Sequence, residues 1–254
     1  MRTKGTITEL SSLSVPLGRN QAAFNFGKES PMKSILTACM LMVVLAWPAS
    51  AAQRIENDNP HHLLQQVAER MLERIRDDRA QVEENPTYLR TIMEEELIPY
   101  TDYRFAAAQV MGRNWRSLND EQRREFVDAF REYLITTYAR VFTQYDETKH
   151  ELQFGREEAF ENERTVVVRA RLNQADGPPI RLNFNLRRQS PDSPWMAFDL
   201  EAENISLLSA QRSEIQSILR QRGFQGAVDL LRERAAVEID LDEELDVDDF
   251  TQGG

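Results

Sequence analysis

Few residues of this chain combine into a pattern that could perform chemistry. His61 and His62 are neighbours at the expected start of a helix, where successive side chains point about 100° apart, so they are poor joint metal ligands. His150 lies at an expected strand boundary. The sequence contains no glycine-rich phosphate loop, no GxSxG elbow and no HExxH motif. We therefore expect no metal site, no cofactor and no catalytic residues, and the chain is not expected to be an enzyme.

Two acidic features have structural explanations that are simpler than catalysis. The residues of the run Glu94–Glu96 face different ways on a helix, so a solvated helix face is expected. Asp199 lies between Phe198 and Leu200 in an alternating strand pattern, which predicts that it projects from the polar face of a sheet. For Asp199 we expect an ion pair with an arginine. The candidate partners are Arg169, Arg171 and Arg187.

Residues 32–51 have the order of a secretory signal peptide. Basic Lys33 precedes a mostly apolar run, and helix-breaking Pro48 and three small residues follow. The run is shorter than the roughly 20 residues of a membrane-spanning helix, so cleavage is expected in preference to a permanent anchor. The single cysteine lies inside this signal, so the exported chain has no disulfide. Residues 1–31 are interpreted as an upstream extension, with translation starting at Met32.

The exported chain is strongly acidic. From residue 52 onward it holds 26 Lys and Arg residues against 40 Asp and Glu residues, a formal net charge of −14. This balance argues against a nucleic-acid partner and against attachment to anionic lipid by overall charge. We expect one domain over residues 52–237. Residues 238–254 are expected to form an acidic, disordered tail, because eight acidic residues and no basic residue lie between positions 238 and 249.

The first half of this domain has helical periodicity. Apolar residues between positions 63 and 75 predict a first helix, and a second follows Pro86 and ends near Pro99. A third piece is expected over about residues 102–111. Asn119 opens the longest helix, with Gln122 as its capping partner. Its inward stripe is expected to face a sheet and consists of Phe126, Phe130, Leu134, Tyr138 and Val141.

From His150 the period falls to two, which predicts strands. Four segments, around residues 150–154, 166–172, 180–186 and 196–202, alternate apolar and polar side chains and are separated by turn sequences. Two closing helices, about 207–222 and 224–237, are expected to meet at Gly223. The predicted fold class is α+β: a four-stranded, curved antiparallel sheet with one apolar face covered by about six helices.

Several segments, taken in order, resemble the signature of the MlaC family, the periplasmic phospholipid-binding proteins also described as toluene-tolerance auxiliary components. The resemblance covers about residues 60–235. It rests on VMGRNW (110–115), NDEQRREF (119–126), FREYL (130–134), TY (137–138), WMAFDL (195–200), ISL (205–207) and RGFQG (222–226). The chain departs from the family at Asn204, where glycine is frequent, and at Gln211, where an aromatic residue is common.

This resemblance implies a periplasmic carrier that shuttles phospholipid and maintains outer-membrane lipid asymmetry. The implied partners are phospholipid, an inner-membrane ABC-type transporter with a periplasmic ring, and an outer-membrane lipoprotein bound to a porin. A diacyl lipid has about 30 methylenes, so shielding its tails from water is worth about 24 kcal/mol at about 0.8 kcal/mol per methylene. Such a carrier needs an apolar cavity between helices and sheet, as in nuclear-transport-factor-2-like folds. The chain is expected to act as a monomer.

The direction in which side chains face suggests which residues contact lipid. The predicted set is Phe130, Leu134, Tyr138, Val168, Leu182, Phe184, Phe198 and Leu200. Three alternatives remain: these residues fill an ordinary core, the cavity belongs to a small isomerase or dehydratase of the same fold, or the chain is a protein-binding adaptor. An enzyme would need an ionisable group that points into the cavity, and the strand faces assigned inward carry none.

Overall fold

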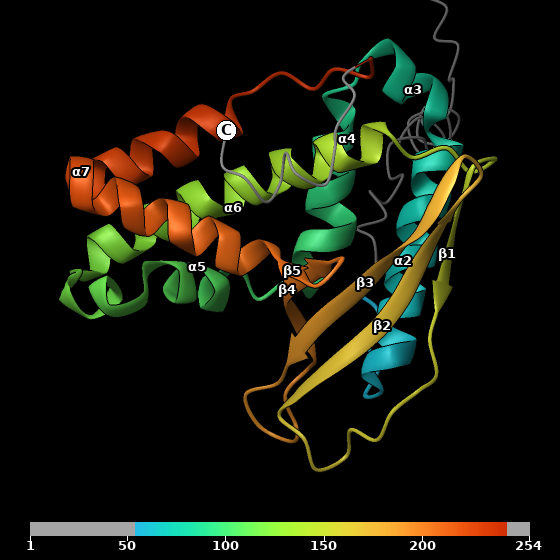
Figure 1. The fold of residues 1–254 in the computed structure, drawn as a ribbon, viewed down its shortest axis with the longest axis horizontal. Helices are drawn as coiled ribbons and strands as arrows, with labels where there is room; N and C mark the ends of the chain where they lie inside the picture. The colour runs from blue at the N-terminus through green and yellow to red at the C-terminus, as the bar shows by residue number, and fades with distance from the viewer. Residues whose placement is uncertain (1–53, 243–254) are drawn as a thin grey trace, which may run out of the picture. The chain divides into compact units, whose positions relative to one another are not determined.

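The computed structural model describes residues 54–242 (Figure 1). The expected extension (1–31), the signal peptide (32–51) and the tail beyond residue 242 lie outside the described residues. Within the described part, no helix combines the length and the apolar character needed to cross a bilayer. The helices are α2 (Pro60–Asp77), α3 (Arg79–Glu84), α4 (Tyr88–Ile92), η1 (Met93–Leu97), η2 (Ile98–Tyr100), α5 (Tyr103–Met111), η3 (Gly112–Ser117), α6 (Asp120–Thr143) and α7 (Leu207–Ala235).

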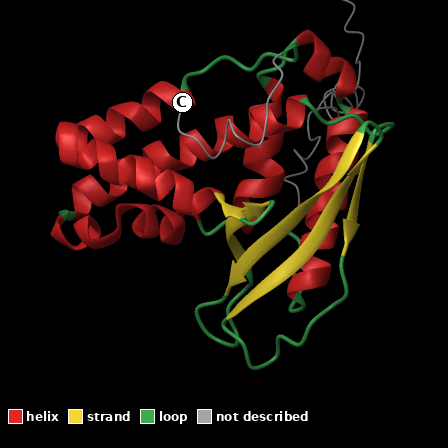
Figure 2. Ribbon diagram, in the orientation of Figure 1, coloured by secondary structure: helices red, strands yellow, loops and turns green. Residues whose placement is uncertain are grey.

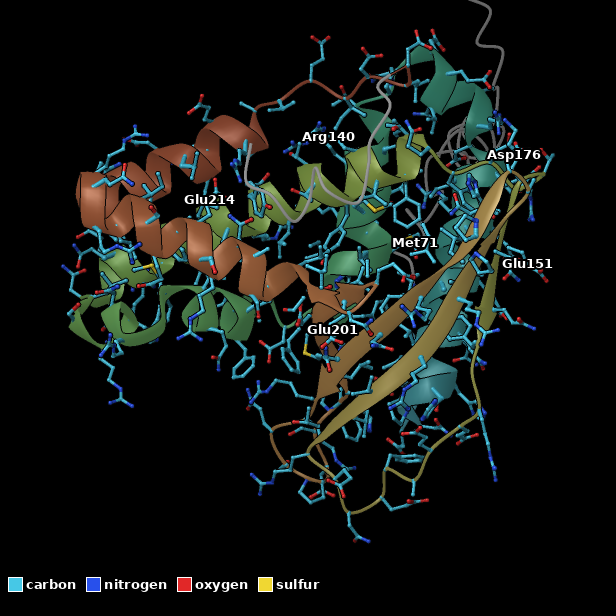
Figure 3. The ribbon with its side chains drawn as sticks, viewed as in Figure 1. Met71, Arg140, Glu151, Asp176, Glu201 and Glu214 are labelled. Carbon is cyan, nitrogen blue, oxygen red and sulfur yellow. The ribbon has the colours of Figure 1, made fainter. Side chains whose placement is uncertain are left out.

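One antiparallel sheet follows the first group of helices, with its strands in chain order (Figure 2). The α+β fold and the four expected strands are confirmed, and a two-residue fifth strand is added. The strands are β1 (His150–Phe154), β2 (Thr165–Gln174), β3 (Gly177–Arg187), β4 (Met196–Ala202) and β5 (Ile205–Ser206). Figure 3 shows Asp176 at the turn between β2 and β3, as the hairpin prediction requires.

The turn between β4 and β5 explains one departure from the family pattern. Glu203 and Asn204 both have positive φ, 50° and 68°. Two-residue hairpin turns with positive φ at both positions favour Gly and Asn, so asparagine can stand where glycine is frequent. Glu203 is also held by Arg181, whose Nη2 lies 2.8 Å from its carboxylate.

The long helix α6 begins as the sequence predicts. The Asn119 side chain accepts a hydrogen bond from the backbone N–H of Gln122 at 2.8 Å, and the Gln122 side chain accepts one from the backbone N–H of Asn119 at 3.1 Å. This capping box satisfies two backbone donors that no helical carbonyl can reach.

The packing of α6 corrects the expectation that its aromatic stripe faces the sheet. Phe126 and Phe130 are buried in a core cluster built from α5, α6 and α7, and their rings stack with centroids 6.2 Å apart. Further along the helix, Tyr138 packs against a second cluster, which includes Met71 and Ile75 of α2. Val141 is 37 % exposed, and the rest of the stripe serves two helical cores. The helix that shares a core cluster with β2 and β3 is α2.

The closing helix α7 is broken where the sequence predicts. Gly223 has φ 70° and ψ −168°, a conformation open essentially to glycine alone. The chain reverses there, so the two halves of α7 lie side by side in Figure 1. The first half packs on α5, and both halves contribute buried residues to the cluster that contains Phe130.

The acidic run Glu94–Glu96 is the expected solvated face at Glu94 and Glu95, but not at Glu96. Its residues belong to η1, a π-helical turn, and Glu96 is only 2 % exposed. The Glu96 carboxylate lies 2.5 Å from Nε of Arg70 and 3.4 Å from Nη1 of Arg74, both on α2. A wider turn displaces side chains from α-helical positions, which is why α-helical periodicity misplaced Glu96.

Candidate functional site

The inner face of the sheet is built from four rows of apolar side chains. Residues paired across antiparallel strands share a face, so the register defines each row. The rows are Leu152–Leu172–Ile180, Phe154–Ala170–Leu182–Ala202, Val168–Phe184–Leu200 and Val166–Leu186–Ala197. Every member is aliphatic or aromatic, so these four rows present no ionisable group.

The rows differ in how completely helices cover them. Val166, Val168 and Leu186 are buried against Leu63 and Val67 of α2, in a cluster that also contains Trp195. The row that contains Leu152, Leu172 and Ile180 is only half-buried, as are Leu182 and Leu200. Among the described residues, these five belong to none of the three core clusters. One end of the face is therefore ordinary core, and the other end is an apolar surface without a tight protein partner.

Small residues lie next to this loosely covered region. Ala170 and Ala202 are 6 % and 8 % exposed and flank Leu182 on the neighbouring strands. Alanine is depleted in strands because its small side chain offers little surface for packing. Two alanines in one row therefore leave space between the larger side chains beside them. The predicted set of lipid-contacting residues, chosen by the direction in which side chains face, did not include Ala170 and Ala202. The sequence does show that these two side chains are small.

The eight predicted contact residues fall into separate environments. Phe130 is 1 % exposed inside the α5–α6–α7 cluster, and Leu134 packs at the edge of that cluster. Tyr138 packs on the α2–α4–α6 cluster. The other five lie on the sheet, where the structure brings Val168, Phe184 and Leu200 into one row beside Leu182, whereas Phe198 is set apart.

Phe198 lies at a β-bulge, which interrupts the alternation expected for β4. The pairing of β3 with β4 shifts between Asn185 and Leu186, so Leu186 is opposite Ala197 and Phe198 has no partner. The Phe198 ring contacts Phe105 of α5 edge-on, with centroids 5.2 Å apart. Phe198 thus joins α5 and β4, while Leu200 keeps its expected place in a row.

Asp199 anchors the start of α7 instead of forming the expected arginine pair. Its carboxylate accepts hydrogen bonds from Ser206 Oγ at 2.7 Å and from the backbone N–H of Leu208 at 3.0 Å. The expected partners Arg169 and Arg187 pair instead with Glu158 and Asp102. Burial raises the pKa of Asp199 above its ordinary value, and the hydrogen bonds from Ser206 and Leu208 oppose that shift.

A polar network lies between α6 and α7. The Tyr133 hydroxyl donates to the Gln211 side chain at 2.5 Å, and Gln211 donates to Glu214, which pairs with Arg234. Burial raises the pKa of the Tyr133 hydroxyl. Gln211 is 7 % exposed, and its partnership with Tyr133 accounts for a polar residue where the family often has an aromatic one.

Tyr138 also remains neutral near physiological pH. Burial raises the pKa of its hydroxyl above the ordinary value, and the charges of Tyr133 and Asp199 raise it further. A half-buried, neutral tyrosine packed on a helical cluster presents a mainly hydrophobic ring.

The histidines have structural roles or exposed positions. His61 is buried, and its Nε2 accepts a hydrogen bond from the backbone N–H of Glu158 at 3.1 Å. His62 is exposed, 3.6 Å from Glu157. Within residues 54–242, no group of three His, Cys, Asp or Glu side chains has metal-binding geometry.

Two surface grooves of the described chain lie elsewhere and are not lined by any of the eight predicted residues. One lies between α6 and α7, is lined largely by charged residues and includes Glu125 and Arg232, which form an ion pair at 3.0 Å. The other lies where residues 235–239 pass Thr87 and Arg90. The apolar sheet face is therefore the feature with the character of a hydrocarbon-binding surface.

Comparison with known proteins identifies a family and a solved structure to which this chain is similar. The model of the MlaC protein family matches residues 65–233. The intermembrane phospholipid transport system binding protein MlaC of Haemophilus influenzae is 27% identical over 183 residues, which is 72% of this chain and 85% of that protein. A phospholipid-binding protein from Ralstonia solanacearum, solved in complex with a phospholipid, has a TM-score of 0.62 at 22% identity and covers 70% of this chain and 97% of its own.

At 22% identity, the solved structure establishes a shared fold. Both relatives are named for phospholipid binding or transport, and neither name states a catalysed reaction. The family model spans most of the described chain, from α2 to the second half of α7. On this evidence the chain belongs to the MlaC family.

Proposed function

We propose that this chain is a soluble periplasmic carrier that shuttles phospholipids between inner-membrane and outer-membrane complexes and so maintains outer-membrane lipid asymmetry. The proposed partners are an inner-membrane ABC-type transporter with a periplasmic ring and an outer-membrane lipoprotein–porin complex. The proposal includes export directed by residues 32–51 and their removal. Family membership and the relatives named for phospholipid transport support it.

The half-buried part of the inner sheet face is the observation that carries the proposal. Leu152, Leu172, Ile180, Leu182 and Leu200 form a continuous apolar area that contains no ionisable side chain. An apolar area of this kind lowers the free energy of acyl chains by about 25 cal/mol for each Å² removed from water. The charged headgroup must stay in water, because an unpaired charge is costly to bury.

We propose that lipid contacts centre on Leu182 and Leu200, with Val168 and Phe184 in the adjoining row. Tyr138 and Leu134 would contact acyl chains from α6. Phe130 and Phe198 complete the predicted set, but each is engaged with other helices, so contact with lipid would require those side chains to move. This ranking predicts that substitutions at the sheet positions change lipid loading more than substitutions at Phe130.

Native mass spectrometry of protein exported to the periplasm tests the proposal. We expect folded copies with the added mass of one or more phospholipids, and Leu182→Asn should lower the loaded fraction because an amide is costly to desolvate. Val167→Asn is the matched control. Val167 is also half-buried, but it lies on the face of β2 opposite to Val168 and the apolar rows. Uniformly empty wild-type protein would refute the carrier function, and equal losses in both variants would place the lipid elsewhere.

A further inference from the structure

Two segments of this acidic chain contain no acidic residue. Residues 103–119 carry Arg104, Arg113 and Arg116, and residues 215–228 carry Arg220 and Arg222, without one Asp or Glu. The whole chain has 42 acidic residues among 254. Both segments therefore carry a net positive charge, unlike the chain as a whole.

The fold places these two segments side by side. Asn114 donates from its side chain to Gln216 at 3.2 Å. Gln216 in turn donates to the backbone carbonyls of Val110 and Met111, at 3.0 and 2.9 Å. In Figure 1 the end of α5 and the reversal of α7 lie on the same side of the helices, away from β1, β2 and β3. Segments about 100 residues apart in sequence thus form one surface.

Two glycines let arginine side chains lie close to this surface. A Cβ added to Gly112 would lie 3.3 Å from Nη2 of Arg212, so the Arg212 guanidinium covers the junction of α5 and η3. A Cβ added to Gly226 would lie only 2.3 Å from Cβ of Arg222, so Arg222 is packed over Gly226. Arg212 therefore extends the surface formed by the two segments.

We call this surface the basic corner, and its members are all exposed. It consists of Arg113, Arg116, Arg212, Arg220 and Arg222. Within the part of the chain that the structure describes, none of these five has an acidic side chain within ion-pair distance. The nearby acid Asp120 is paired with Arg123, at 3.1 Å. The basic corner thus presents five uncompensated guanidinium groups.

The acidic character of the rest of the chain does not cancel this local charge. At physiological ionic strength the field of an exposed charge is screened over about 8 Å. A flat anionic surface that approaches the basic corner therefore responds to the five arginines more than to distant carboxylates.

The side chains between the arginines indicate the kind of partner. A specific protein interface is organised around large apolar anchors that insert into shaped pockets. The large exposed hydrophobic residues of the described chain are Val141, Ile205 and Val237, and all three lie outside the basic corner. Trp115 lies beside the arginines but is half-buried, with the Arg123 guanidinium over its ring. A layer of lipid headgroups requires only matching charge, and guanidinium groups bind phosphate oxygens in bidentate geometry.

We infer that the basic corner docks this protein, reversibly and by charge, on an anionic phospholipid bilayer. This inference goes beyond the carrier function and does not require an occupied lipid site. Because each arginine near an anionic membrane contributes on the order of 1 kcal/mol, removal of three should weaken binding by more than tenfold.

Co-sedimentation of the exported full-length chain with lipid vesicles tests this inference. We expect binding to vesicles that contain phosphatidylglycerol, no binding to pure phosphatidylcholine vesicles, and loss of binding at about 0.5 M salt. Arg113→Gln, Arg116→Gln and Arg220→Gln combined should abolish most of the binding.

The matched control removes the same charge elsewhere. Arg156→Gln, Arg164→Gln and Arg171→Gln combined replace three exposed arginines in and before β2. The control variant should bind vesicles like wild type. Equal losses in the two triple variants would overturn the inference, because net charge would then suffice. A wild-type chain that ignores anionic vesicles would also overturn it and would indicate an acidic protein as the partner of the basic corner.

Discussion

Nε of Arg70 lies 2.5 Å from the carboxylate of Glu96, and this contact joins α2 to the π-helical turn η1. The Glu96 side chain is 3 % exposed and the Arg70 side chain 28 %. Arg70 also donates to the Tyr100 hydroxyl at 2.9 Å, while Arg74 approaches the other oxygen of Glu96. A buried carboxylate with two cationic neighbours is costly to disrupt, because its removal leaves charge without compensation in a poorly hydrated place.

Glu96→Gln should therefore lower the free energy of unfolding by about 2–3 kcal/mol. Urea unfolding followed by circular dichroism measures the change. Glu95→Gln is the control, since Glu95 also contacts Arg74, at 3.1 Å, but its side chain is 47 % exposed. An exposed pair is worth less than about 1 kcal/mol, so the control should unfold nearly like wild type. Similar losses in both variants would show that burial of Glu96 adds nothing.

The break in α7 leads to a prediction about backbone strain. Gly223 has positive φ, and nothing lies within 4 Å of the position that a Cβ would occupy. Gly223→Ala should therefore destabilise the fold by about 1–3 kcal/mol through strain alone, without a steric clash. Gly177→Ala is the control, because its φ is not in the positive range and its nearest Cβ neighbour is 3.6 Å away. If Gly223→Ala unfolds like wild type in urea, the sharp reversal of α7 does not depend on glycine.

Much of the fold could be predicted from local patterns. The Asn119–Gln122 capping box, the break at Gly223 and the pairing of four strands each depend on neighbouring residues, and all are confirmed. The π-helical turn at Glu96 and the bulge at Phe198 each change the side-chain period within a few residues, so a constant period misplaces the side chain there.

The partners of an apolar stripe are harder to predict than the stripe itself. Periodicity identified Phe126 and Phe130 as inward residues of α6, although Val141 of the same stripe is exposed. Periodicity does not distinguish a sheet from a pair of helices as the opposing layer. The contacts of Phe130 with α5 and α7 depend on how α7 folds back at Gly223.

The start of the acidic tail was also hard to predict. The tail was expected from residue 238 onward, yet Ile239 is 4 % exposed and packs with α2 and α4. One buried isoleucine among acids has too weak a sequence signal to be recognised.

The raised pKa of Asp199 has a definite effect on stability. Because burial raises its pKa above 3.8, the folded chain binds more protons than the unfolded chain between 3.8 and the folded value. Stability contributed by this group is therefore lost as pH rises through that interval and is constant above it. Asp199→Asn removes the titration but keeps a side-chain oxygen that can accept from the Leu208 N–H.

The comparison needs urea unfolding of both proteins over a pH series that starts near pH 4. We expect the free energy of unfolding of the wild type to fall relative to that of Asp199→Asn as pH rises, with the other carboxyl groups cancelling in the difference. Parallel profiles would contradict a raised pKa. A difference of the opposite sign would mean that the hydrogen bonds from Ser206 and Leu208 outweigh burial.

Ala170 provides the most direct test of whether acyl chains lie above the sheet. It is 6 % exposed and is paired with Leu182, beside the half-buried apolar rows. Ala170→Leu adds three carbon atoms where we propose that hydrocarbon binds, so the loaded fraction in native mass spectrometry should fall. The same change can overpack the region at a cost of about 1–3 kcal/mol, so thermal unfolding must show that the variant is folded. Ala175→Leu is the matched control, because Ala175 is exposed in the β2–β3 turn and should load lipid like wild type. If folded Ala170→Leu protein carries as much phospholipid as the control, the acyl chains do not occupy the space above the Ala170 row.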